Sequence, residues 1–99
     1  MAVVSMMRLR GDVSQLGARM ESRRAAAGKL DERYGRLVTV AARTDDGILV
    51  VNLWESDEAG NLGHDPDMLE PLHAAGLPEP AFEAYDVLHY DVRPEAVAG

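Results

Sequence analysis

One nearly continuous apolar segment constrains the fold of this chain more than any other feature. Residues 48–56 read Ile-Leu-Val-Val-Asn-Leu-Trp-Glu-Ser, so apolar side chains occupy both alternating positions up to the tryptophan, interrupted only by Asn52. A strand with one solvated face alternates apolar and polar residues, whereas a strand buried on both faces does not. We therefore expect a sheet that is covered on both sides, and a chain of 99 residues has little material to cover both by itself.

Composition is typical of a single domain in a reducing compartment. A chain of 99 residues matches one domain, with a core over about 2–92 and a loose tail over 93–99. Cysteine is absent, which excludes disulfides and thiolate metal sites. No apolar segment approaches the length of about 20 residues that a membrane span needs, and the N-terminal residues lack the pattern of a signal peptide. We expect a cytoplasmic protein that makes no membrane contact.

The charges are distributed unevenly along the chain. The formal net charge is −7, but residues 1–43 carry a balance of +5 and residues 44–99 a balance of −12. Such asymmetry can mark a nucleic-acid contact, yet the basic residues are spread thinly and no aromatic residue lies among them before Tyr34. The pattern favours two oppositely charged, solvated surfaces, which can meet across a subunit contact, over the binding of nucleic acid.

Breaks in the apolar pattern divide the chain into strands and helices. Strands are expected over 2–9, 37–43, 48–55 and 81–92. Asp46-Gly47 predicts a hairpin between the second and third strands, because glycine readily takes the positive φ that a tight turn requires.

Helices are expected in the two longer gaps between these strands. Asp12, with Gln15 three residues on, forms a capping pattern that begins the first helix, and Gly28 is expected to fray its end. Ser56 caps a short helix, and Asp65-Pro66 begins another. The resulting order is β-α-β-β-α-β.

That order is the one of the ferredoxin-like α+β fold, in which a four-stranded antiparallel sheet carries both helices on one face. The other face would then expose an apolar patch larger than monomers tolerate. We therefore expect a homodimer in which two sheets pack face to face.

The end of the apolar segment resembles a known family. Residues 51–59, Val-Asn-Leu-Trp-Glu-Ser-Asp-Glu-Ala, are similar to the W-x-S-x-E-A ending of the third strand in the antibiotic-biosynthesis-monooxygenase-like branch of the dimeric α+β barrel superfamily. By element order, the resemblance covers residues 2–92. It implies a small-molecule enzyme that acts on a hydrophobic or aromatic compound without a bound cofactor, as a monooxygenase or a polyketide cyclase. Haem-degrading members use an asparagine, a tryptophan and a histidine, of which only the histidine has a counterpart here, His73.

Four residues are candidates for the site that this resemblance implies. Asn52 and Trp54 share one face of the third strand and would position the substrate, while His73 would transfer protons. Tyr85 would hydrogen-bond a phenolic substrate. Each residue also has a purely structural interpretation: Trp54 and Tyr85 as packing residues, Asn52 bonded to backbone or buried water, and His73 as a half-exposed histidine.

Other chemistries lack a matching pattern. His64 beside Asp65 and Asp67 is better explained as the acidic, solvated start of a helix than as a metal site. The sequence has no nucleophile elbow, glycine-rich phosphate loop or zinc-protease motif. The alternative to an enzyme is a non-catalytic homodimer that binds a ligand or a partner, with Asn52 and Trp54 serving the interface.

Overall fold

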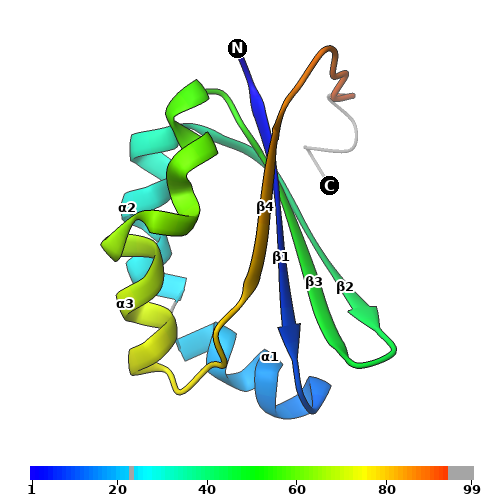
Figure 1. The fold of residues 1–99 in the computed structure, drawn as a ribbon, viewed down its shortest axis with the longest axis vertical. Coiled ribbons are helices and arrows are strands. Elements are labelled where there is room, and N and C mark those ends of the chain that lie inside the picture. Colours follow the sequence, from blue (N-terminus) through cyan, green and yellow to red (C-terminus); the bar gives the residue numbers. More distant parts are fainter. Residues whose placement is uncertain (23, 94–99) are drawn as a thin grey trace.

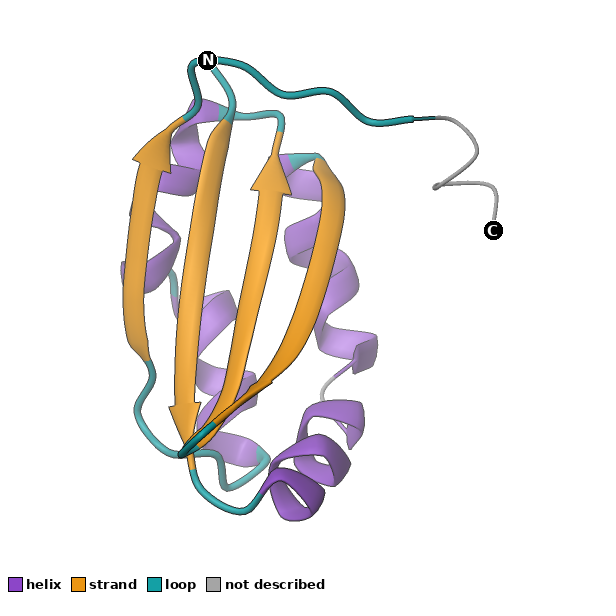
Figure 2. Ribbon diagram, turned by 90° about the vertical axis from the view of Figure 1, so that its right-hand side faces the viewer, coloured by secondary structure: helices purple, strands orange, loops and turns teal. Residues whose placement is uncertain are grey.

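The computed structural model describes residues 1–22 and 24–93 of the chain. Its elements are β1 (Val3–Arg10), α1 (Val13–Ser22), α2 (Arg24–Tyr34), β2 (Arg36–Thr44), β3 (Gly47–Trp54), the 3-10 helix η1 (Asp57–His64), α3 (Pro66–Ala74) and β4 (Ala81–Asp86). The strands form one antiparallel sheet in the order β2-β3-β1-β4, and the helices lie together on one of its faces (Figure 1, Figure 2). The predicted ferredoxin-like α+β fold is confirmed.

The central strands β1 and β3 carry the core. They pair in an unbroken register from Val3 opposite Trp54 to Arg10 opposite Gly47. On the helix side, these strands contribute a row of buried apolar residues: Val3, Met7, Leu9, Ile48, Val50 and Trp54. On the other side, Leu49, Val51 and Leu53 are half-buried, so β3 is apolar on both faces, as its sequence predicts. We call this second side of the sheet the open face.

The first helical region begins as predicted but ends later. The backbone N–H of Gln15 donates to the Asp12 carboxylate at 3.1 Å, as the capping pattern requires. The expected fraying at Gly28 is wrong, because α2 continues through this glycine to Tyr34. Leu30 and Tyr34 are buried against the core, and this packing outweighs the cost of about 1 kcal/mol that glycine adds within a helix.

The second helical region follows its capping residues closely. The Ser56 hydroxyl accepts a hydrogen bond from the Glu58 N–H at 3.2 Å at the start of η1, and Asp65 caps α3. Gly76 has a φ of +74° and closes α3, as the Leu77 N–H donates back to the Leu72 carbonyl at 3.0 Å. Among the described residues, no helix is both long and apolar enough to cross a membrane.

Strand β4 is shorter than the sequence predicts, ending at Asp86 instead of residue 92. Asp86 pairs with Val3, the first residue of β1, so the next residues have no strand beside them apart from one bond from the Val87 N–H to the Ala2 carbonyl at 2.8 Å. The chain then runs across the strand ends toward β2 (Figure 2), and Leu88 is almost fully exposed. Of the predicted tail, residues 94–99 lie outside the described residues.

The hairpin at Asp46-Gly47 forms as predicted, but for a different reason. Gly47 is not among the glycines of positive φ, which are Gly11, Gly35 and Gly76. A Cβ atom at Gly47 would instead lie 1.9 Å from the carbonyl oxygen of Leu9 on β1. Glycine is therefore required for the close approach of two backbones and fixes the register at this end of the sheet.

A polar cluster joins the end of α2 to the start of α3. The Tyr34 hydroxyl donates to the Asp65 carboxylate, and the Arg33 guanidinium contacts Asp65 at 2.9 Å and Asp67 at 2.5 Å. The hydrogen bond from Tyr34 lowers the pKa of the Asp65 carboxyl below its usual value, and the same bond raises the pKa of the Tyr34 phenol. The bond thus favours a neutral phenol beside a charged carboxylate.

We predict that Gly47→Ala lowers the free energy of unfolding by about 3 kcal/mol, because the new methyl group must push β1 and β3 apart. Urea unfolding followed by tryptophan fluorescence measures the loss. Gly17→Ala is the matched control: a Cβ atom there meets nothing within 4 Å, so the variant should be as stable as the parent or slightly more stable. Equal stabilities for the two variants would contradict the assigned role of Gly47.

We also predict that Tyr34→Phe lowers stability at neutral pH by about 2 kcal/mol, since it removes a hydrogen bond to a charged group. The contribution of Asp65, whose pKa is lowered on folding, is present above its unfolded pKa of about 3.9 and is lost as the pH falls through the folded value. The contribution of Tyr34, whose pKa is raised, is present below about pH 10 and is lost as the pH rises further.

The difference between the parent and Tyr34→Phe should therefore be largest near neutrality and shrink at both extremes, as measured by urea unfolding across the pH range. Tyr85→Phe is the control, because the Tyr85 hydroxyl donates to Glu83 on an exposed surface, and its stability should equal that of the parent throughout. A Tyr34→Phe effect that does not change with pH would refute the coupling to Asp65.

Candidate active site

Trp54 is the last residue of β3 and lies on the helix side of the sheet, opposite Val3. Its side chain is buried, and its indole N–H donates to the hydroxyl of Ser5 on β1 at 2.8 Å. The ring meets Tyr34 edge to face with 6.0 Å between centroids. With its N–H satisfied and its ring enclosed, Trp54 is placed as a packing residue. Trp54 could therefore contribute to substrate binding only by shaping the packing around Asn52, because its own ring and N–H have no room for a ligand.

Asn52, two residues earlier on β3, faces the same side as Trp54 and is only partly buried. Its Oδ1 atom is buried and has no hydrogen-bond partner. Rotation of the amide would exchange its oxygen and nitrogen and place a donor at this position instead of an acceptor. Buried carboxamide atoms are nearly always bonded. The Oδ1 atom of Asn52 is therefore an unsatisfied hydrogen-bond acceptor that a ligand could satisfy.

Asn52 is less covered on the side of β2 than on the side of β1. In the register of the sheet, Asn52 stands between Ser5 on β1 and Thr39 on β2. Ser5 is almost fully buried, whereas Thr39, Ala41 and Arg43, which point to the helix side of β2, are all exposed. We call these three residues the uncovered strip of β2. A ligand that lies against this strip would reach the amide of Asn52 from its accessible side.

The other two predicted site residues lie elsewhere. His73 is on the exposed side of α3, where its Nε2 atom lies 3.3 Å from the Glu79 carboxylate. Tyr85 is on β4 opposite Val4, and its side chain is on the open face of the sheet. The four residues therefore do not share one site: the structure brings Asn52 and Trp54 together on one face and places His73 and Tyr85 apart from them.

The acidic start of α3, at Asp65 and Asp67, is less solvated than its pattern predicts, because the Asp65 side chain is only 10% exposed. Both aspartates bind Arg33, and Asp65 also accepts hydrogen bonds from Tyr34 and from the Asp67 N–H, the latter at 2.9 Å. These carboxylate oxygens accept the hydrogen bonds that link α2 to the start of α3.

Two residues of the site escaped the sequence reasoning. Ser5 is the only polar residue at a buried position of β1, and a serine that interrupts an apolar strand is the signal that could have identified a buried hydrogen-bond partner. Thr39 gave no such signal, because an exposed threonine is common in strands. Its relevance comes from the register, which sets it beside Asn52.

Comparison with known proteins identifies a similar fold. No protein-family model matches the sequence, and no curated protein sequence matches it. The structure is similar to two crystal structures of SnoaB, a cofactor-independent oxygenase from Streptomyces nogalater, one of which has an asparagine replaced by alanine. The TM-scores are 0.58 and 0.57 at 13% and 14% sequence identity, and 90% of this chain and 93% of SnoaB are covered.

Identity this low is evidence for the fold alone. At that level, the match confirms the fold that the resemblance of the W-E-S-D-E-A segment implies. The chain has the ferredoxin-like α+β fold of the cofactor-independent oxygenase SnoaB.

Proposed function

We propose that this protein is a small-molecule enzyme of the cofactor-independent monooxygenase type, acting on a hydrophobic or aromatic compound held against Asn52. The observation that carries the proposal is the buried, unpaired amide atom of Asn52 beside the uncovered strip of β2. The similarity of the fold to SnoaB supports the reaction class.

The chemistry of such an enzyme explains why an amide is useful at this point. An oxygenase that binds no cofactor must take electrons from its own substrate, so the substrate has to ionise to an electron-rich enolate or phenolate. In an anthrone, loss of a methylene proton gives an aromatic phenolate; reaction with O₂ then converts the methylene to a carbonyl and releases water. The Oδ1 atom of Asn52 would accept a hydrogen bond from a hydroxyl of the bound phenol, and rotation of the amide would place an N–H group there to donate to the developing phenolate oxygen and lower the barrier to this ionisation.

Trp54 and Ser5 contribute to the proposal by position. Their hydrogen bond of 2.8 Å links β3 to β1 beside Asn52, so the amide is held by paired strands and not by a loop. The proton-transfer role predicted for His73 receives no support from its exposed position, where it lies beside Glu79.

A polyketide cyclase would use the same amide to stabilise an enolate without consuming O₂. The non-catalytic alternative, a homodimer that binds a ligand or a partner, would use Asn52 for binding only. Oxygen uptake separates the monooxygenase from the other two functions, because only the monooxygenase consumes one O₂ for each substrate molecule.

We predict that Asn52→Ala lowers the rate of dithranol oxidation by about a hundredfold, the usual effect of removing one donor to a developing oxyanion. An oxygen electrode and the absorbance of the quinone product measure the rate. The same variant should be as stable as the parent or more stable, because it removes an unpaired buried polar atom. A structural asparagine would show the reverse, a loss of stability with little change in rate.

His73→Gln is the matched control in this assay, and it should retain the parental rate. A rate lowered equally by both variants would mean that the predicted role of His73 is correct after all. If the parent does not oxidise dithranol faster than buffer does, while dithranol still binds and Asn52→Ala weakens its binding, the oxygenase proposal fails in favour of the non-catalytic alternative.

We also propose that the protein is a homodimer that packs through the open face. This face has an apolar centre, and between it and the chain after β4 lies a hollow of about 410 Å³. Val40 and Tyr85 on this face are each about half exposed. Apolar exposure of this kind on a small chain is typical of a protein–protein interface.

The open face is tested by two substitutions at neighbouring positions of β2. Val40 points to the open face and Thr39 to the helix side, so Val40→Lys should give a monomer in sedimentation while Thr39→Lys stays a dimer. The lysine at position 40 would bury an unpaired charge at the interface. A parent that sediments as a monomer at micromolar concentration would refute the dimer.

A further inference from the structure

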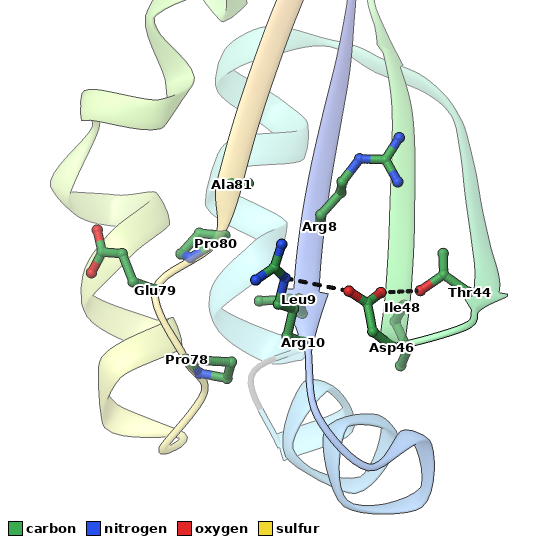
Figure 3. A pocket seen from close by; sticks show the side chains of 10 residues that line it. All are labelled: Arg8, Leu9, Arg10, Thr44, Asp46, Ile48, Pro78, Glu79, Pro80 and Ala81. Carbon is green, nitrogen blue, oxygen red and sulfur yellow. Dashed lines mark hydrogen bonds and ion pairs between the residues drawn. The ribbon is translucent and has the colours of Figure 1, made fainter.

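A second cavity lies at the end of the sheet near the hairpin, away from Asn52 (Figure 3). It has a volume of about 600 Å³ and is bounded by the last residues of β1, the β2–β3 hairpin and residues 78–81. Strand β4 begins at Ala81, opposite Arg8, so the last two residues of β1 have no strand on that side. Pro78 and Pro80 have no N–H to extend the ladder, and the sheet therefore stays open here.

Two arginines project from β1 at this cavity. Arg8 and Arg10 are two residues apart and so lie on the same side of the strand. The Arg10 Nε atom lies 3.3 Å from the Asp46 carboxylate, which also accepts a hydrogen bond from Thr44 at 3.1 Å. Arg10 is thus paired with a carboxylate of the hairpin, with both side chains exposed.

Arg8 differs from Arg10 in having no carboxylate partner among the residues that the structure describes. Within residues 1–22 and 24–93, its guanidinium makes no hydrogen bond or ion pair. The other carboxylate at the cavity, that of Glu79, is turned away from the two arginines (Figure 3) and lies beside His73. The cavity therefore carries one uncompensated positive charge in a chain whose net charge is −7.

Apolar groups complete the wall around this charge. Pro78, Pro80 and Ala81 line the cavity, as do Leu9 and Ile48, whose side chains are turned to the helix side and buried there. Its volume is within the range of about 300–1,000 Å³ that is typical of small-molecule sites. One guanidinium matches the geometry and charge of one carboxylate, with two parallel hydrogen bonds, whereas a doubly charged phosphate would need a second free cation.

We propose that this cavity binds a small organic carboxylate with an apolar body, its carboxylate on Arg8 and its apolar part against the two prolines. The site is separate from Asn52, because Arg8 points to the open face and Asn52 to the helix side of the sheet. The proposal does not depend on the proposed oxygenase activity.

Calorimetric titration with naphthoate tests this site on the full chain. Arg8→Gln should raise the dissociation constant about tenfold, since it removes a charge-assisted pair of hydrogen bonds. Arg93→Gln is the matched control: it removes the same charge from an exposed position after β4 that does not line the cavity, and naphthoate affinity should stay within about twofold of the parent. Naphthalenemethanol, a neutral analogue, should bind more weakly and equally to all three proteins.

Two results would overturn the proposal. One is a failure of naphthoate to bind saturably below millimolar concentration, or an equal loss of affinity in both arginine variants. The other comes from amide chemical shifts: naphthoate should perturb Arg8 and Ala81, and perturbation confined to Asn52 and Thr39 would assign the ligand to the proposed oxygenase site instead. The second result would leave the proposed function intact, so the two proposals fail separately.

Discussion

The register between β1 and β3 is the constraint on which the rest of the structure depends. It sets Trp54 within reach of the Ser5 hydroxyl and brings Gly47 against the Leu9 carbonyl, so that both ends of the pair are fixed by contacts that no other register would satisfy. A slip of one residue would turn every core side chain of β3 to the open face. The same register places Asn52 between Ser5 and Thr39, and so defines the candidate site.

The two faces of this sheet are covered unequally, and both proposed sites follow from that inequality. The helices bury β1 and β3 but leave the uncovered strip of β2 exposed, which gives access to Asn52. The open face has no helices (Figure 2); its centre is apolar and its hairpin end carries Arg8 and Arg10. The helix side of the sheet therefore carries the amide of Asn52 within an apolar layer. The open face carries the charge of Arg8 at the edge of an apolar patch.

Sequence patterns predicted the elements of this fold well because the determinants are local. The caps at Asp12, Ser56 and Asp65 act within three residues, and the two-sided apolarity of β3 is visible in one segment. The errors in the element bounds came from tertiary contacts. Packing of Leu30 extends α2 beyond Gly28, and β4 ends at Asp86 because its partner there is Val3, the first residue of β1. The shared face of Asn52 and Trp54 could be predicted because both lie on one strand, whereas the places of His73 and Tyr85 depend on how separate elements dock.

The strongest argument for a ligand at Asn52 is energetic. An unpaired buried polar atom costs about 1–3 kcal/mol relative to a bonded one, while an apolar side chain of similar size would pack against Trp54 and Val50 at no such cost. Stability alone therefore selects against asparagine at this position. The Ser5 hydroxyl shows that the same sheet can satisfy a buried polar group when it needs one. Local rules of folding are commonly broken at functional sites, and the unpaired amide is most simply explained by a bound molecule that completes its hydrogen bonds.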